Sequence, residues 1–259
     1  MRPLIILGLS AVTAIGAFYW YGTWLPDPEI PMEHVSTLSD TEYRQGSLRK
    51  ADTIARRSPR LSEALEALEL ELGAPVFVRI FKESKELEIW VESKKDGKFH
   101  HFKTWPIAAM SGNLGPKLAE GDRQAPEGFY HVGASRMKPD SSYHLAFNVG
   151  YPNTYDRAHG RTGSFIMVHG NRVSIGCFAM TDYWIEEIYT LCDQALENGQ
   201  SYFRVHIFPF RMTDERLAQE TNSPWYNFWK NLQDGYQWFE TYKSPPNTTV
   251  ANKEYVFDE

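Results

Sequence analysis

Cys177 and His169 are the residues of this chain best suited to covalent chemistry, and they stand eight positions apart within the run 165–182. A thiol attacks a carbonyl only as the thiolate, and a free cysteine with a pKa of about 8.5 is mostly protonated at neutral pH. An imidazole within hydrogen-bond reach can accept that proton. Because a loop of this length can fold the histidine, at the end of an apolar strand, back onto the sulfur, the spacing predicts a cysteine nucleophile with a histidine base.

The residues around the cysteine suit the same chemistry. Gly176 has no side chain, so a substrate carbonyl could approach the backbone N–H groups of Gly176 and Cys177, which we expect to form an oxyanion hole. Thr181 and Asp182 predict a helix N-cap, and the partial positive charge of a helix N-terminus favours a thiolate just upstream.

Two other interpretations of Cys177 stay open at this point. A lone cysteine in an apolar neighbourhood is usually a small buried side chain. In an oxidising compartment Cys177 could also form a disulfide with Cys192, the second of the two cysteines. Cys192, however, falls on the apolar stripe that Ile185 and Ile188 begin in the helix predicted from 182 to 197, and this spacing points it into a core.

At residues 169–177 the order His-Gly, then Ser-x-Gly-Cys, resembles the signature of the L,D-transpeptidase catalytic domain family of the YkuD type, cysteine enzymes of bacterial peptidoglycan. Residues 110–113 and 125–132 are similar to the family's Gly-rich, Thr-Pro-x-Gly-x-Phe segment, and the resemblance covers about residues 74–210. It implies acyl transfer at the diaminopimelate of peptidoglycan stem peptides. The implied roles are nucleophile for Cys177, base for His169 and orientation of the histidine for Ser174, with no cofactor.

The chain departs from the family pattern beside the cysteine. Most members have a longer loop between the two halves of the motif, and an arginine two positions after the cysteine that is thought to engage the substrate. Here the loop is short and Phe178, Ala179 and Met180 follow the cysteine. Residues 148–156 and the aromatic C-terminal part resemble a subgroup in which some members cut the bond between a murein-bound lipoprotein and the cell wall, which implies hydrolysis and such a lipoprotein as partner.

Residues 3–25 form the only strongly apolar run, uninterrupted by charge and preceded by Arg2. A run of about 20 apolar residues can span a bilayer, and the aromatic residues at 19–21 and 24 are typical of a membrane interface. We expect residues 1–25 to be an uncleaved signal anchor; a cleaved signal peptide, with small residues at 14–17, stays open. Either interpretation predicts a periplasmic or other extracytoplasmic location.

The net charge of −6 argues against nucleic acid as a partner, since phosphate binding needs a basic face. The remaining sequence predicts a linker and helix over 26–73, the catalytic domain over 74–210 and an aromatic helical extension over 211–259 that packs on the domain. Ser58 and Pro59 predict the start of the first helix and Gly73 its end. The helix pattern of the extension begins at Ser223.

Alternation of apolar residues with period two predicts antiparallel hairpins from Pro75 onward. The expected strands lie at about 76–81, 87–91, 102–107, 129–134, 143–149, 164–168 and 203–210. These strands and the predicted helices indicate the fold class α+β, with an antiparallel sheet. With the resemblance, the expectation is an antiparallel, β-sandwich-like L,D-transpeptidase domain with flanking helices and an N-terminal membrane segment.

The long loop from Ser111 to Gly128 is rich in glycine and proline, and long loops in compact domains are often functional. We assign it to the substrate cleft. Tyr151, Tyr155 and Arg157, together with Tyr143, are candidate substrate-binding residues, because aromatic walls suit sugars and peptides and arginine suits carboxylates.

Two functions of other classes remain as alternatives. A metal-dependent peptidoglycan amidase could use His159, His169 and Cys177 with His131 or His144, although these residues lack a known ligand spacing, so no metal is expected. A non-catalytic wall-binding module on a membrane tether would not need Cys177 at all.

Overall fold

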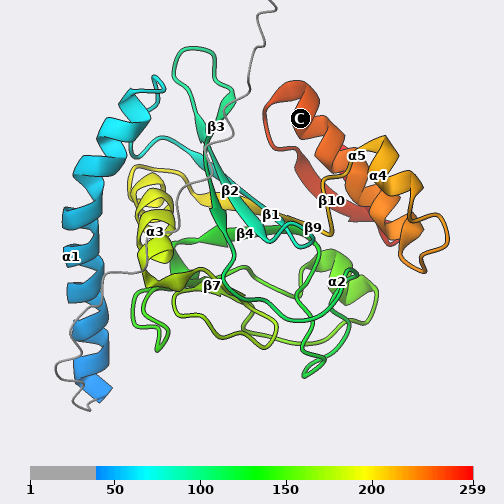
Figure 1. The fold of residues 1–259 in the computed structure, drawn as a ribbon, viewed down its shortest axis with the longest axis horizontal. Coiled ribbons are helices and arrows are strands. Elements are labelled where there is room, and N and C mark those ends of the chain that lie inside the picture. The colour runs from blue at the N-terminus through cyan, green and yellow to red at the C-terminus, as the bar shows by residue number, and fades with distance from the viewer. Residues whose placement is uncertain (1–38, 259) are drawn as a thin grey trace, which may run out of the picture. The chain divides into compact units, whose positions relative to one another are not determined.

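The computed structural model describes residues 39–258, which contain two main sheets, flanking helices and a C-terminal hairpin (Figure 1). The predicted membrane segment 1–25 and the start of the 26–73 segment lie outside the described residues. Among residues 39–258, no helix is both long and apolar enough to cross a bilayer.

The larger sheet has five strands in the order β3-β2-β1-β9-β4. Their bounds are Val76–Phe81 for β1, Glu86–Glu92 for β2, Phe99–Pro106 for β3, Gly128–Gly133 for β4 and Tyr202–Phe208 for β9. The predicted hairpins β1–β2 and β2–β3 are confirmed as antiparallel. A purely antiparallel sheet was the wrong expectation, because β1 and β9 pair in parallel. Parallel neighbours need a crossover, and here the crossover contains the whole second sheet.

The second sheet is built from very short strands in the order β5-β6-β7-β8. They are Met137–Lys138, Ala146–Asn148, Met167–His169 and Phe178–Ala179, with the 3-10 turn η1 at Ala134–Arg136 before β5 and helix α2 at Thr154–Ala158 between β6 and β7. β7 pairs with β6 in antiparallel fashion and with β8 in parallel. The residues that carry the candidate chemistry lie at the end of β7 and just before β8.

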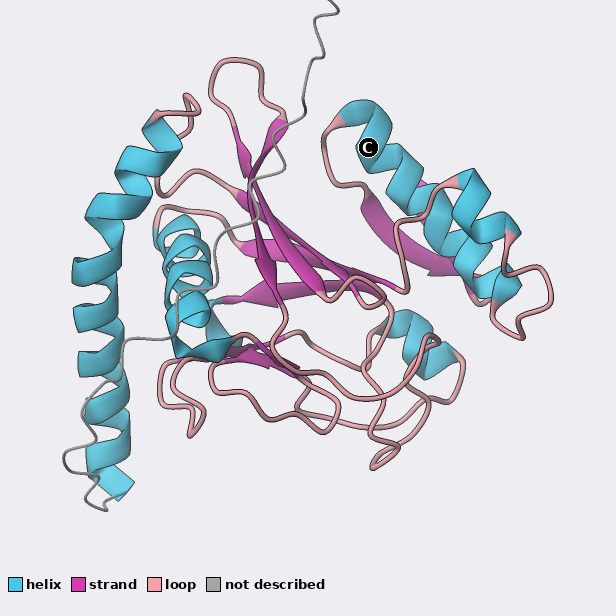
Figure 2. Ribbon diagram, in the orientation of Figure 1, coloured by secondary structure: helices cyan, strands magenta, loops and turns pink. Residues whose placement is uncertain are grey.

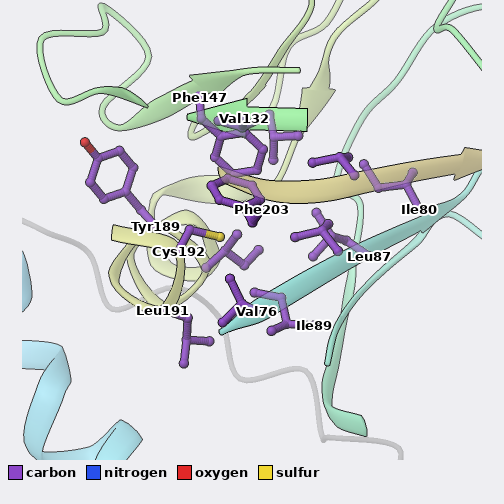
Figure 3. Close-up of a cluster of buried hydrophobic side chains, with 14 of the residues drawn as sticks. Val76, Ile80, Leu87, Ile89, Val132, Phe147, Tyr189, Leu191, Cys192 and Phe203 are labelled. Atoms are coloured by element: carbon purple, nitrogen blue, oxygen red, sulfur yellow. The ribbon is translucent and has the colours of Figure 1, made fainter. Parts of the chain in front are cut away.

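The main core is shared by both sheets, α1 and helix α3, which spans Thr181–Glu197. Phe203 of the larger sheet and Phe147 of the second sheet meet edge to face, with ring centroids 5.3 Å apart. Figure 3 shows Cys192 among Val76 and Phe203, and its side chain is fully buried. The predicted core position of Cys192 is confirmed.

The opposite face of the larger sheet is covered by the C-terminal part of the chain. Helices α4 (Asp214–Ala218) and α5 (Tyr226–Tyr242) pack there with the hairpin β10–β11, Asn247–Ala251 and Glu254–Asp258 (Figure 2). The prediction of an all-helical extension missed this hairpin. Every residue of β1 is therefore buried, because both faces of the strand are covered.

Helix α1 runs from Ser39 to Glu66 beside α3 (Figure 1). The predicted start at Ser58 is wrong, since Pro59 lies inside the helix. The buried stripe of Thr53, Arg57, Leu61 and Leu65 continues across the proline. Tertiary packing of this stripe on α3 compensates for the backbone hydrogen bond that proline cannot donate.

Candidate active site

The strand pairing brings the segments of Cys177 and His169 together. β7 and β8 are in parallel register, with Val168 opposite Phe178 and His169 opposite Ala179, so Cys177 lies one step before β8, alongside Met167. The Met167 N–H donates to Cys177 Sγ at 3.4 Å. Strands lie about 5 Å apart and residues two apart on a strand about 6.6 Å apart, which places the Cα atoms of His169 and Cys177 roughly 8 Å from each other.

Both cysteines are free thiols, which removes the disulfide alternative. Cys177 is partly buried at the end of its loop, just before β8. Its Sγ also lies 3.6 Å from the Phe165 carbonyl oxygen. Burial raises the pKa of the Cys177 thiol, and the Met167 N–H and the positive charge of Lys117 oppose that rise. The thiol therefore needs a base.

His169 is buried, with only 3% of its surface exposed. Its Nδ1 lies 2.5 Å from the Gly170 carbonyl oxygen, and because a carbonyl can only accept, Nδ1 must carry the proton. The neutral ring then presents Nε2 as its basic atom. Burial lowers the pKa of His169, against the opposing effects of the Gly170 carbonyl and the Asp182 carboxylate. The ring is thus neutral and able to accept a proton at neutral pH.

Ser174 does not take the position expected for a residue that orients the histidine. Its hydroxyl donates to the Cys177 carbonyl at 2.6 Å and accepts from the Gly176 N–H at 3.3 Å, so it closes the turn before the nucleophile. The expected oxyanion donor Gly176 N–H is therefore engaged, by a long hydrogen bond. Gly176 itself has φ +125, which a residue with a side chain rarely adopts.

The start of α3 also differs in part from the prediction. The Thr181 hydroxyl accepts the Trp184 N–H at 3.4 Å, as an N-cap side chain does. Asp182 instead turns back, and its Oδ1 accepts the Asn171 N–H at 2.7 Å. Asp182 therefore fixes the loop that leaves His169 rather than the helix end.

The 111–128 loop, which we call the cleft loop after its predicted role, runs close to the turn before the nucleophile; its assignment to a substrate cleft stays a prediction. It follows a segment attached to β8, where Ala108 and Ala109 exchange backbone hydrogen bonds with Ala179. A Cβ on Gly176 would lie 3.5 Å from the Gln124 carbonyl oxygen. In the same loop Lys117 is buried and pairs with Asp122 Oδ1 at 2.5 Å. Sequence reasoning missed Lys117, since a lysine in a glycine-rich loop carries no motif.

The loop is anchored by a buried ion pair. Lys82, just after β1, donates from Nζ to Glu127 Oε1 at 2.9 Å and to the carbonyls of Gly115 and Ala125. Glu127 Oε2 accepts from Trp229 Nε1 of α5 at 2.8 Å. Both charged side chains are fully buried. The cleft loop is thus tied to the sheet and to the C-terminal helix together.

Comparison with known proteins identifies the family of this chain. The sequence profile of the L,D-transpeptidase catalytic domain, YkuD, matches residues 76–207. The protein named "Putative L,D-transpeptidase YafK" of Escherichia coli K12 is 44% identical over 185 residues, which cover 71% of this chain and 74% of that protein. The chain belongs to the L,D-transpeptidase catalytic domain family.

Among solved structures, the helical cell shape determining protein Pgp2 from Campylobacter jejuni is similar to this family member with a TM-score of 0.43 and 21% identity. The match covers 69% of this chain and 73% of that chain. Bd1075 of Bdellovibrio bacteriovorus matches with a TM-score of 0.37 and 18% identity, over 69% of this chain and 78% of that one.

The three expected substrate-binding residues of this L,D-transpeptidase-family protein have partners within the chain, and their role toward a substrate stays a prediction. The Tyr151 hydroxyl donates to the carbonyls of Lys117 and Thr162 and so joins two loops. Tyr155 is buried, with its ring centroid 4.3 Å from those of both His159 and Tyr255. Arg157 bonds the Pro152 carbonyl and, with Tyr155 and Tyr255, lines a cavity of about 130 Å³ between β4, α2 and β10. Tyr155 and Arg157 thus lie beside the C-terminal hairpin β10–β11.

Several large apolar side chains that lie near the cysteine in the sequence or belong to the cleft loop are exposed, and we call them the apolar rim. Val173 and Ile175 precede Cys177 in its loop, Phe165 supplies the carbonyl near Sγ, and Leu118 comes from the cleft loop; their exposed fractions are 56%, 80%, 70% and 45%. Large apolar residues inside a short polar loop were the sequence signal for this rim.

The histidines of the metal alternative have separate partners. His144 Nε2 lies 2.9 Å from Glu186 Oε1, and His159 Nε2 lies 2.8 Å from the Lys253 carbonyl oxygen. Among residues 39–258, no three His, Cys, Asp or Glu side chains are grouped so that they could hold a metal ion.

Proposed function

We propose that this protein is a cysteine-dependent acyl-transfer enzyme that remodels peptidoglycan at the diaminopimelate of stem peptides. The observation that carries the proposal is the parallel register of β7 and β8, which sets a free, partly exposed thiol two residues along the ladder from a neutral, proton-accepting imidazole. Membership of the L,D-transpeptidase family supports the substrate class.

The reaction begins with proton transfer from Cys177 Sγ to His169 Nε2, which converts the thiol into the nucleophilic thiolate. The sulfur attacks the carbonyl carbon at the L-centre of diaminopimelate, and a tetrahedral oxyanion forms. Collapse of this intermediate breaks the C–N bond, the leaving amine takes the proton from Nε2, and a thioester to Cys177 remains. Attack by an amine completes a transpeptidation, whereas attack by water completes a hydrolysis.

Stabilisation of the oxyanion falls to the backbone amides of Gly176 and Cys177 in this proposal. The Gly176 N–H is held by Ser174 Oγ through a 3.3 Å bond, which is weak enough to exchange for a bond to a negatively charged oxygen. Ser174 therefore holds the Gly176 N–H in the free enzyme and releases it when the oxyanion forms.

We propose the hydrolytic form, which releases wall-bound lipoprotein, as the physiological activity. The position where the resemblance expects a substrate-binding arginine is Ala179, a fully buried residue of β8 that pairs with His169 and Ala109. The apolar rim of Phe165, Val173 and Ile175 suits a polypeptide better than a second sugar-linked stem peptide. The proposal includes an extracytoplasmic location, because murein lies outside the cytoplasm.

Mass spectrometry of muropeptides after incubation with the purified protein tests the proposal. Release of lipoprotein free of diaminopimelate indicates hydrolysis, and new 3-3 cross-links indicate transfer. C177A should abolish either product, while C192A, which changes only a buried core thiol, should keep it. Activity lost to EDTA but retained after alkylation would indicate a metal-dependent amidase, and wall binding without turnover that C177A leaves unchanged would indicate a binding module.

A further inference from the structure

We infer that helix α1, which precedes the family-matched segment, is a functional part of the candidate active site: Arg49 and Gly46 hold the 139–144 loop so that Tyr143 covers His169. This inference rests on the proposed function, because it assigns a positioning role toward the same base.

Arg49 fixes the loop through its backbone. Its Nη1 donates to the carbonyl oxygens of His144 at 2.6 Å, Ser141 at 3.0 Å and Pro139 at 3.3 Å. Nη1 carries two hydrogens, so the two shorter bonds, to His144 and Ser141, use one each, and the longer contact with Pro139 shares one of them. A single side chain of α1 thus sets the path of a loop 90 to 95 residues away in the sequence.

Gly46 allows the loop to lie directly against α1. A Cβ at this position would come within 2.9 Å of the Cα and N of Asp140, closer than side-chain carbons pack against backbone. Gly46 lies one turn before Arg49, and residues three apart share a helix face. The glycine weakens the helix relative to alanine, which is consistent with a need for close approach here.

The other end of the loop contacts the base. The rings of Tyr143 and His169 have centroids 4.9 Å apart at an interplanar angle of 39°. A Cβ on Gly170 would lie 2.7 Å from the Tyr143 carbonyl oxygen and 3.0 Å from His144 Cβ. The glycine of the His-Gly motif is therefore required by the loop that α1 holds, as well as by the Asp182 carboxylate at 2.5 Å.

A second contact secures the loop at His144, whose Nε2 meets Glu186 of α3. Glu186 accepts from both Arg56 and Arg57 of α1, at 2.7 and 2.8 Å. The loop is thus held between α1 and α3.

The 139–144 loop, held by Arg49 and Gly46, keeps water from one side of the His169 imidazole and limits the rotation of the ring. The titratable or charged groups that face the ring are Tyr143 and Asp182. Those that belong to or face the covering loop are Asp140, Arg49 and the cluster of His144, Glu186, Arg56 and Arg57. Neither Arg49 nor Gly46 touches the imidazole. Both are therefore positioning residues, and their effect must pass through Tyr143.

The test is the pH dependence of Cys177 alkylation by iodoacetamide, followed on the full chain by peptide mass spectrometry. It needs no peptidoglycan, and the buried Cys192 serves as an internal unreactive thiol. R49A and G46A should react about tenfold or more slowly at pH 7 than the wild type, since a positioned base contributes on the order of 100-fold or more. The pH dependence of their alkylation rates should become more like that of H169A.

Controls separate positioning from folding. K50A removes the neighbouring salt bridge to Asp193 of α3 without touching the loop, and should react as the wild type does. G46A replaces glycine by a better helix former, so loss of reactivity with unchanged or higher thermal stability excludes simple unfolding. In a Y143A background, R49A should cause no further change, because both act through one contact.

The outcomes distinguish the two proposals. If H169A shifts the profile and R49A, G46A and Y143A do not, the role of α1 is refuted while the cysteine–histidine pair stands. If H169A itself reacts as the wild type does, the proposed function fails and the positioning role fails with it.

Discussion

At the scale of single residues, burial shifts the pKa values of the two reactive groups in opposite directions. Burial lowers the pKa of His169 and raises the pKa of Cys177, so the resting pair is a neutral imidazole and a neutral thiol. Catalysis needs the imidazole unprotonated, and a lowered pKa keeps it so at more acidic pH. We predict that kcat/KM for peptidoglycan turnover falls only below pH ~6.5, the ordinary histidine value.

The variant D182N tests whether His169 is the group that titrates on the acid side of this pH profile. The Asp182 carboxylate raises the pKa of His169, whereas asparagine keeps an oxygen for the Asn171 N–H without the charge. The acid limb of the pH profile should therefore move to still lower pH. A limb that moves upward would show that the titrating group is not His169, and D234N, at an exposed position of α5, is the matched control.

The sequence could predict the segment around the cysteine and the histidine because both lie in one short run whose ends are fixed by strand pairing. The partners of Ser174, Tyr155 and Arg157 could not be predicted. Their contacts are chosen by segments distant in sequence, such as Tyr255 beside Tyr155, or by turn geometry, as for Ser174. The roles of Lys117 and Arg49 could not be predicted either, because they too depend on segments distant in sequence.

At the scale of elements, long strands with regular alternation were predictable, and β6 and β7 lie within or overlap two longer strands that were predicted. The two-residue strands β5 and β8 were not predictable, since so short a run has no measurable period. The parallel pairing of β1 with β9 was also hidden, because alternation does not record which strand lies alongside. The cleft loop depends on a feature with no local signal at all, the buried Lys82–Glu127 pair.

We predict that K82M destabilises the protein by about 3–5 kcal/mol, because it leaves the Glu127 carboxylate buried without its cation. The double variant K82M/E127L should be more stable than K82M, since two apolar side chains leave no unpaired charge. Urea denaturation measures both. K95A, which breaks an exposed pair with Glu69, should leave the midpoint unchanged, and a K82M midpoint equal to that of K95A would contradict the prediction.

At the scale of the whole molecule, the family-matched segment 76–207 lacks the C-terminal part of the chain, which covers one face of the larger sheet. The larger sheet buries Phe77, Phe81 and Phe208 on the face that α5 covers, and all three side chains are fully buried. Phe77 packs on Phe239 with ring centroids 4.7 Å apart. Burial of such a side chain contributes roughly 1.5–3 kcal/mol, so the three together supply about 5–9 kcal/mol.

That sum is comparable to the whole stability of a typical domain, about 5–15 kcal/mol. We therefore predict that a fragment of residues 39–210 does not form a stable native state, binds the dye ANS and loses Cys177 reactivity at pH 7, whereas residues 39–258 unfold in one transition. Within the intact chain, F239A should cost about 3–5 kcal/mol, while Y242A, at an exposed position of the same helix, should cost far less. A cooperatively folded 39–210 fragment would show instead that the C-terminal part is an independent addition to a self-sufficient domain.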